Sequence, residues 1–221
     1  MKEYPLTLNA YKLIWKKEEL MLLPEKCMYW PTQKALLIAD THLGKITHFR
    51  KSGIAVPDRA AYRNLQRLET LLKSYKPDKV YFLGDLFHSE LNTEWLAFKD
   101  LLRTYPHIHF ILIQGNHDIL HEVSYANLKF EVHTEPLKVG PFILSHEPLE
   151  NCEGYNLCGH IHPGVRMMGA ARQSMRLPCF YFGEKGGILP AFGEFTGLYI
   201  LHPKKQNQVF IIAGSKVLKA I

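Results

Sequence analysis

Short apolar runs, each ended abruptly by polar residues, form the main pattern along the chain. They cover residues 35–39, 80–83, 108–113, 142–144 and 155–158. Runs of this length are typical of strands that are buried on both faces. Between them, residues 58–75 and 93–105 place apolar side chains at helical spacing, and prolines stand at the boundaries of both stretches. With a third helix expected over residues 119–128, the alternation of strands and helices predicts an α/β fold.

The two ends of the chain show a different pattern. Residues 6–39 and 178–221 are rich in strand-forming segments broken by Gly and Pro. We therefore expect a mixed or second sheet built from the two chain ends. The chain contains no repeat, low-complexity tract or Ser/Gly/Pro-rich linker, so residues 1–221 are expected to form a single domain. A hydrophobic content of 47% with 22% charged residues argues against a disordered protein.

Every one of the five apolar runs is followed by Asp, Asn or His. The segments are D-T-H at 40–42, G-D-L-F-H at 84–88, G-N-H-D at 115–118, S-H at 145–146 and G-H-I-H at 159–162. Half of the twelve histidines lie in these segments. Ligand sites of open α/β sheets gather at the carboxyl ends of strands, so these side chains are expected to meet.

The chemistry of this set of side chains favours metal binding. Carboxylate, amide and imidazole together suit divalent ions such as Mn²⁺, Fe²⁺ and Zn²⁺. Two such ions about 3.5–4 Å apart lower the pKa of water and clamp an in-line displacement at phosphorus. Each motif alone is weak evidence, since D-x-H and N-H-D also occur in ordinary turns. Five of them in succession, each after an apolar run, indicate a metal site.

Composition narrows the class of protein further. The formal net charge of +6 permits an anionic partner. Four cysteines without a C-x-x-C pair argue against a disulfide framework and a zinc ribbon. No apolar run approaches the length of a membrane span, and the first residues lack the apolar core of a signal peptide. We therefore expect a cytoplasmic protein with no membrane attachment.

The order D-x-H, G-D-x-x-H, G-N-H-D, a lone His and G-H-x-H resembles the signature of the calcineurin-like metallophosphoesterases. The resemblance implies an α/β sandwich of two mixed β-sheets flanked by helices, and phosphoester hydrolysis at a centre of two divalent ions. Mn²⁺ is the leading candidate, with Fe²⁺ or Zn²⁺ as alternatives. The ligands implied are Asp40, His42 and His162 for the first metal, Asn116, His146 and His160 for the second, and Asp85 for both. The implied role of His117 is to stabilise charge at the phosphate or to protonate the leaving oxygen.

Two positions depart from the commonest form of this signature. Many phosphatases of the family have Asp-Arg where this chain has His88 and Ser89. The form found here is similar to the SbcD-type DNA repair nucleases, in which the matching histidine partners the histidine of G-N-H. The resemblance thus pairs His88 with His117 as catalytic residues. Glu147 follows the lone histidine where many members have Gly, and we expect its carboxylate to be solvated.

Segments outside the motifs resemble a smaller subfamily. W-P-T-Q-K-A-L-L-I-A-D-T-H-L-G-K at 30–45 and L-P-A-F-G-E-F-T-G at 189–197 are similar to the PdeM-type, ligase-associated DNA damage response endonucleases. That name reflects genomic association with a ligase and a helicase, so the partners implied are repair proteins of those kinds.

Basic residues follow two of the metal motifs. No acidic residue stands between Asp40 and Asp58, or between Glu153 and Glu184. The substrate-binding candidates in these acid-free segments are Lys45, Arg50 and Arg166. Cations at these places suit contacts with phosphate.

Three functions remain open from the sequence. The first is a DNA repair-associated nuclease that hydrolyses phosphodiester bonds of nucleic acid. The alternative is the same chemistry on a nucleotide or nucleotide-sugar. A non-catalytic scaffold is the third, and it is disfavoured because every ligand position is filled. The sequence does not distinguish a DNA from an RNA substrate or exonuclease from endonuclease action, and it does not give the oligomeric state.

Overall fold

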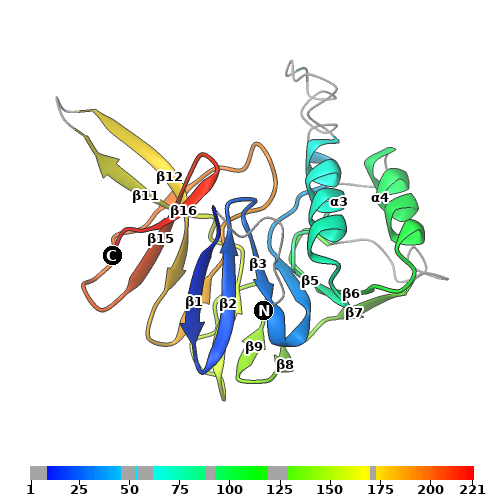
Figure 1. Cartoon of the computed structure of the whole chain (residues 1–221), viewed down its shortest axis with the longest axis horizontal. Helices are drawn as coiled ribbons and strands as arrows, with labels where there is room; N and C mark the ends of the chain where they lie inside the picture. The colour runs from blue at the N-terminus through cyan, green and yellow to red at the C-terminus, as the bar shows by residue number, and fades with distance from the viewer. Residues whose placement is uncertain (1–8, 46–52, 54–61, 88–92, 119–128, 170–172) are drawn as a thin grey trace.

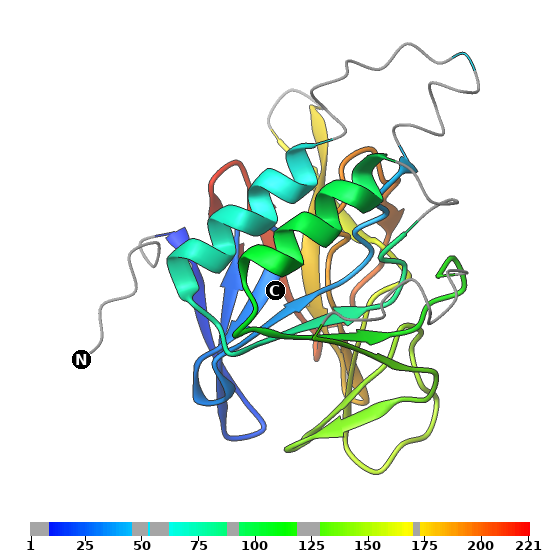
Figure 2. The same ribbon diagram turned by 90° about the vertical axis from the view of Figure 1, so that its right-hand side faces the viewer.

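The fold is a sandwich of two mixed β-sheets with helices on the outer face of the first (Figures 1 and 2). The computed structural model describes residues 9–45, 53, 62–87, 93–118, 129–169 and 173–221. Within this part of the chain, no helix combines the length and the apolar character needed to span a membrane. The α/β sandwich predicted from the sequence is confirmed.

The first sheet contains seven strands in the order of the sequence. They are β1 (Tyr11–Trp15), β2 (Glu18–Leu23), β3 (Cys27–Trp30), β4 (Ala35–Ile38), β5 (Lys79–Leu83), β6 (His109–Ile113) and β7 (Phe130–His133). Strands β1 to β4 pair antiparallel, whereas β4 to β7 pair parallel. Helix α3 (Arg63–Tyr75) connects β4 to β5, and α4 (Thr93–Thr104) connects β5 to β6. A 3₁₀ turn, η2 (Pro31–Gln33), joins β3 to β4.

The second sheet contains nine strands from the C-terminal part of the chain. They are β8 (Leu137–Val139), β9 (Phe142–Leu144), β10 (Tyr155–Cys158), β11 (Pro163–Met168), β12 (Ser174–Phe182), β13 (Gly186–Ile188), β14 (Tyr199–Ile200), β15 (Gln208–Ala213) and β16 (Lys216–Lys219). Their order is β14-β11-β12-β13-β10-β9-β8, and β15 pairs with both β12 and β16. Strand β10 pairs parallel with β9 and with β13.

The five strands predicted from the apolar runs are confirmed as β4, β5, β6, β9 and β10. Both helices expected between the first three runs are present, and the one expected over 58–75 begins at Arg63 within the described residues. The helix expected over 119–128 lies outside the described residues. The expectation that the two chain ends share one sheet is wrong, because the N-terminal strands join the first sheet and the C-terminal strands the second.

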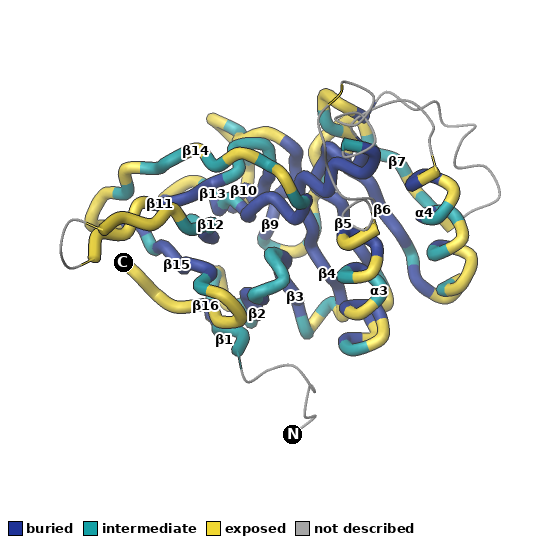
Figure 3. Tube along the Cα trace, turned by 90° about the horizontal axis from the view of Figure 1, so that it is seen from above, coloured by how far each residue is buried: buried dark blue, intermediate teal, exposed yellow. Residues whose placement is uncertain are grey.

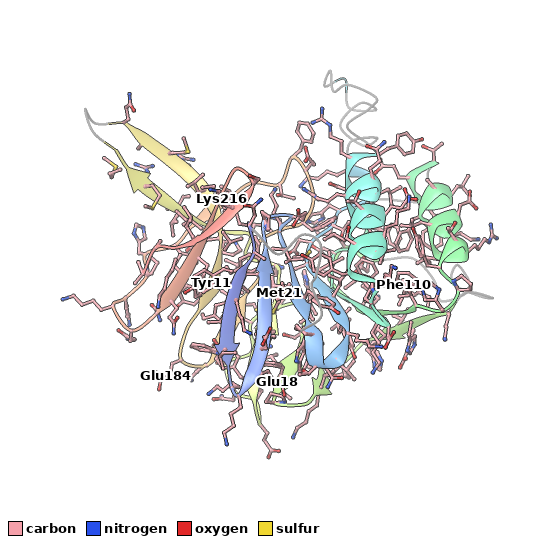
Figure 4. The ribbon with its side chains drawn as sticks, viewed as in Figure 1. Tyr11, Glu18, Met21, Phe110, Glu184 and Lys216 are labelled. Carbon is pink, nitrogen blue, oxygen red and sulfur yellow. The ribbon has the colours of Figure 1, made fainter. Side chains whose placement is uncertain are left out.

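The physical reason for that correction is the short connection between β3 and β4. An antiparallel neighbour can be reached through a few residues, so η2 leads β3 directly alongside β4. The two ends of the chain nevertheless pack against each other across the sandwich, since the ring centroids of Tyr11 and Phe210 lie 4.6 Å apart. Figure 4 labels Tyr11 on β1 and Lys216 on β16, which lie on neighbouring parts of the fold.

Two apolar clusters stabilise the sandwich. One lies between the first sheet and the helices and contains Phe110 (labelled in Figure 4) together with Phe82 and Phe98 of α4, whose ring centroids are 5.9 Å apart. The other fills the space between the sheets, where Leu37 and Tyr81 lie in one cluster with Phe142, Phe180 and Phe182. The strands β4, β5 and β6 are therefore buried on both faces (Figure 3), as the continuous apolar runs predict.

Candidate metal centre

The loops after β4, β5, β6, β9 and β10 meet at one end of the sandwich. The Asp40 N–H donates to the carbonyl of Gly84 at 3.2 Å, and the Gly159 N–H donates to the carbonyl of His146 at 3.0 Å. The first bond joins the loops after β4 and β5 of the first sheet. The second bond joins the loops after β9 and β10 of the second sheet. The chemistry-bearing segments predicted from the sequence are thus gathered in one place.

Five of the residues in these loops have left-handed backbone conformations. The φ angles are 52° at Asp40, 48° at His42, 49° at Asp85, 66° at His160 and 52° at His162. Residues other than Gly adopt this region at a cost, and such residues cluster at functional sites. The conformation turns the backbone sharply after β4, β5 and β10, so the side chains of these three loops can converge.

Asp40, His42 and His162 form the first group of potential metal ligands, and one ligand atom from each lies within 4.8 Å of the others. The Nε2 atoms of His42 and His162 are 3.3 Å apart. The Nε2 of His162 is 3.6 Å from the Asp40 carboxylate, which is fully buried. Two ring nitrogens and a carboxylate oxygen at these distances can bind one ion together.

Asp85, His146 and His160 form the second group, within the same distance limit. The Nε2 of His146 lies 3.0 Å from the Nδ1 of His160 and 3.5 Å from an oxygen of Asp85. The amide oxygen of Asn116 lies 2.8 Å from the same Nε2 atom. The amide oxygen of Asn116 therefore adds a fourth potential ligand atom to this group.

The Asp85 carboxylate lies between the two groups. One of its oxygens is 3.5 Å from His146, and the other is 3.9 Å from the Nε2 of His42 in the first group. This is the position that a carboxylate shared by two ions must occupy. The complete set of donors, four imidazoles, two carboxylates and one amide, fits two divalent ions of the Mn²⁺, Fe²⁺ or Zn²⁺ type.

Glycines permit this close packing of ligands. A Cβ atom on Gly159 would lie 2.5 Å from an oxygen of Asp40, and one on Gly115 would lie 2.5 Å from an oxygen of Asp85. Neither distance is possible for a real side chain. Both positions thus require Gly for the same reason, the approach of the backbone to a buried carboxylate.

Backbone groups fix the orientation of the ligands. The His160 N–H donates to both oxygens of Asp40, at 3.0 and 2.9 Å. The His117 N–H donates to an oxygen of Asp85 at 3.0 Å. The Nδ1 of His146 lies 3.1 Å from the carbonyl oxygen of Leu83, so this nitrogen carries the proton and the lone pair of Nε2 is available to a metal.

Asp118 is a supporting residue that the sequence analysis did not identify. One of its oxygens accepts a hydrogen bond from the Phe87 N–H at 3.0 Å, and the other accepts from the Gly115 N–H at 2.9 Å. Burial raises the pKa of Asp118 to about 6, although both hydrogen bonds oppose the shift. The residue stands in the G-N-H-D segment, where Asp could equally serve a turn, and only the fold shows which loops it joins.

Helix α3 and a C-terminal loop support the first motif from outside. The Asn64 side chain donates to the carbonyl of Thr41 at 3.2 Å and accepts from the Glu194 N–H at 3.2 Å. The Gly193 N–H donates to the carbonyl of Asp40 at 2.9 Å. In the first turn of α4, buried Glu94 accepts from the Gly44 N–H at 2.8 Å. These contacts join segments far apart in the chain, and no local pattern signals them.

The predicted catalytic and substrate-binding residues lie in different places. His117 is exposed beside the first group, with its ring centroid 5.9 Å from that of His42. Partial burial lowers the pKa of Lys45, and the neighbouring carboxylates of Asp85 and Asp40 oppose that shift. Arg166 is exposed on β11, outside both ligand groups. His88 and Arg50 lie outside the described residues, whereas Glu147 is exposed, as predicted.

Comparison with known proteins agrees with this geometry. Residues 34–185 match the family model described as calcineurin-like phosphoesterase. A search of curated protein sequences finds no match. Among solved structures, the Pseudomonas putida nuclease MPE is 30% identical, with a TM-score of 0.79 over 96% of this chain and 100% of that one. The phosphoesterase Yfce from E. coli is 13% identical, with a TM-score of 0.43 over 84% of this chain and 97% of that one.

The family model spans more than half of the chain and includes every segment that carries a potential ligand. Both ligand groups lie where the chain's loops converge, and their donors fit two divalent ions. The chain therefore belongs to the calcineurin-like phosphoesterase family and is a metal-dependent phosphoesterase.

Proposed function

We propose that the chain hydrolyses phosphodiester bonds of nucleic acid at a two-metal centre, with residues 1–221 acting as a single domain. The observation that carries this proposal is the pair of ligand groups that share the Asp85 carboxylate. The likeness to a nuclease over 96% of the chain favours nucleic acid as the substrate. A DNA repair role, as in the PdeM-type subfamily, rests on the sequence resemblance alone.

The proposed ligands follow the two groups. Asp40, His42 and His162 would hold the first ion, Asn116, His146 and His160 would hold the second, and Asp85 would be shared by both. When bound, such a pair of ions generates a nucleophile from water at neutral pH and offsets the charge that develops on the phosphate. Mn²⁺ is the proposed metal, and Fe²⁺ and Zn²⁺ are the alternatives that the same donors accept.

His117 is proposed to protonate the leaving oxygen or to stabilise its charge. Its exposed ring lies beside the first ligand group, and its backbone N–H is held by Asp85. A histidine is suited to this task because its ordinary pKa lies near neutral pH. His88 is proposed to orient the His117 ring, and Lys45 and Arg50 to contact the phosphates of the substrate.

For the cellular setting, we propose a cytoplasmic enzyme that works with DNA ligase and helicase proteins of repair. The basis is the resemblance of the segments at 30–45 and 189–197 to the ligase-associated subfamily.

The test of this function compares the wild-type chain with Asp85→Asn. We expect the wild type with Mn²⁺ to hydrolyse bis(p-nitrophenyl) phosphate and to cleave an oligonucleotide. Asp85→Asn should lose roughly 100-fold or more in both reactions, because loss of an outer partner of a ligand alone costs about 10–100-fold. Its Mn²⁺ content, measured by elemental analysis, should also fall.

Asp100→Asn is the matched control, since Asp100 is an exposed carboxylate on α4 whose ion pair with Arg103 is at the surface. Full activity in Asp85→Asn would refute the two-metal mechanism. The substrates compared should be single-stranded DNA, duplex DNA, RNA and nucleotides. Turnover of nucleotides without cleavage of any polymer would replace nucleic acid by a small molecule as the substrate.

A further inference from the structure

The hairpin of β11 and β12 projects from the body of the second sheet (Figure 1). Strand β11 begins at Pro163, directly after the proposed ligand His162, so it runs away from the metal centre. The residues of its outer part are exposed, in contrast to the buried strands around the centre (Figure 3). An element that leaves the fold from the metal centre itself is well placed to contact a long substrate.

Two arginines lie directly opposite each other on this hairpin. Arg166 of β11 is the cross-strand partner of Arg176 of β12. Both are exposed, and neither forms an ion pair with another residue of the described part of the chain. Like charges opposite each other destabilise a strand pair, so stability of the hairpin does not explain them. No acidic residue stands between Glu153 and Glu184, which leaves the hairpin purely cationic.

Side-chain alternation shows which way these arginines point. Successive side chains of a strand face opposite sides of the sheet, so Arg176 shares a face with Phe180 and Phe182. Those two phenylalanines are buried in the core between the sheets. Both arginines therefore lie on the face of the hairpin that, nearer the body of the sheet, carries Phe180 and Phe182. The opposite face of the hairpin carries exposed Met167 and Met175.

We propose that the β11–β12 hairpin is an arm that binds the backbone of a nucleic-acid chain, with Arg166 and Arg176 contacting phosphates away from the cleaved bond. This proposal rests on the proposed function. Arg166 lies four residues after His162, a separation of about 13 Å along a strand. Measured along the axis of a duplex, that distance corresponds to a rise of about four base pairs. Guanidinium groups are suited to such contacts because they bind phosphate through paired hydrogen bonds.

The experiment uses the double variant Arg166→Ala/Arg176→Ala of the full chain. Cleavage of an oligonucleotide is measured as kcat/KM over a series of salt concentrations with Mn²⁺ constant. The slope of log(kcat/KM) against log[salt] is negative, and each lost phosphate contact reduces its magnitude by about 0.7 for single strands and 0.9 for duplexes. For the loss of both contacts we expect a slope smaller in magnitude by about 1.4–1.8, a raised KM, and unchanged hydrolysis of bis(p-nitrophenyl) phosphate.

Two further variants isolate the effect of the arm. Lys216→Ala/Lys219→Ala removes the same charge from β16, where both lysines are exposed, and should leave the slope close to that of the wild type. Arg166→Lys/Arg176→Lys keeps the charge and should restore most of the salt dependence. A dinucleotide substrate is too short to reach the arm, so the wild type and all three double variants should cleave it equally well.

If the slope of Arg166→Ala/Arg176→Ala equals that of the wild type, the hairpin does not bind the nucleic-acid backbone. The exposed methionines Met167 and Met175 would then favour a protein as its partner. Equal losses on oligonucleotide and bis(p-nitrophenyl) phosphate would also overturn the proposal, because the arginines would then act on the centre itself. A failure of the proposed function would be recognised by a different result, because the wild type would then hydrolyse bis(p-nitrophenyl) phosphate but cleave no nucleic acid.

Discussion

The Asp118 side chain illustrates how a single carboxylate can hold two loops of a metal centre. Its two oxygens accept from the Phe87 N–H and the Gly115 N–H, so it connects the loop after β5 with the loop after β6. Asp85 and Asn116, two of the proposed ligands, stand in those loops. The position of Asp85 relative to Asn116 thus depends on a residue that binds neither ion.

We predict that Asp118→Asn destabilises the protein and lowers its activity. An amide has one acceptor oxygen, so one of the two backbone N–H groups would face the amide N–H₂ instead. A buried hydrogen-bonding group left without a partner costs about 1–3 kcal/mol. Urea unfolding should show a loss of this size, and kcat on bis(p-nitrophenyl) phosphate should fall. Asp100→Asn serves as the control, and a wild-type unfolding midpoint in Asp118→Asn would contradict the prediction.

Among single residues, the sequence indicated those that the structure brings into the two groups of potential metal ligands, but not the residues that support these groups. Asp40, His42 and His160 could be identified because each stands in a polar segment that directly follows an apolar run. Asn64, Asp118 and Gly193 could not, because each acts through a bond to a distant backbone group. Asn64 and Gly193 support the first motif from 23 or more residues away in the chain, and no periodicity reports such a contact.

Among the elements, α3 does more than cover a sheet. Its apolar face packs on β4 and β5 through residues such as Leu68 and Leu72. Its first turn carries Asn64, which bonds to the loop with Asp40 and to the loop with Gly193. Arg67, one turn later, lies with its guanidinium 4.1 Å from the Phe192 ring centroid and donates to the carbonyl of Phe192. The helix therefore holds the first metal-binding loop and the C-terminal loop together.

We predict that Asn64→Ala lowers the free energy of unfolding by about 1–3 kcal/mol, since the Thr41 carbonyl and the Glu194 N–H both lose a partner. The loop with Asp40 would move, so the affinity for Mn²⁺ should fall as well. Thermal unfolding and a Mn²⁺ titration measure the two effects. Gln66→Ala, on the exposed side of the same helix, should change neither. Equal behaviour of the two variants would show that α3 does not position the loop.

Local patterns in the sequence predicted the buried strands β4, β5 and β6 of the first sheet and β9 and β10 of the second. The continuous apolar runs and the prolines at helix boundaries are properties of short segments, and the strands and helices they predict are present. The pairing of the chain ends could not be predicted in the same way. Whether β3 lies beside β4 or beside a C-terminal strand depends on the packing of the whole sandwich, which alternation within a single strand does not encode.

The whole molecule divides its metal centre between two sheets. The first sheet carries Asp40, His42, Asp85 and Asn116, whereas the second carries His146, His160 and His162. Each ligand group takes members from both sheets, so bound ions would link one sheet to the other. The cluster also holds buried carboxylates and imidazoles close together, which is costly without compensating charge.

We predict that metal ions stabilise the whole fold. An ion at about 100 times its dissociation constant adds about 2.7 kcal/mol, which corresponds to an increase in Tm of about 5–10 °C for a chain of this size. Scanning calorimetry of the chelated protein, before and after addition of Mn²⁺, measures this shift. Asp85→Asn should show a smaller shift because it impairs both groups, and an identical Tm in the two wild-type states would contradict the prediction.

The division of ligands between the sheets also matters while the protein is being synthesised. The ribosome makes Asp40, His42, Asp85 and Asn116 long before His146, His160 and His162, and the first sheet can form before the second exists. A growing chain therefore carries no complete ligand group until β10 and its loop have emerged and paired with β9. A phosphoesterase built in this way completes both groups of potential ligands only after His162 has been synthesised.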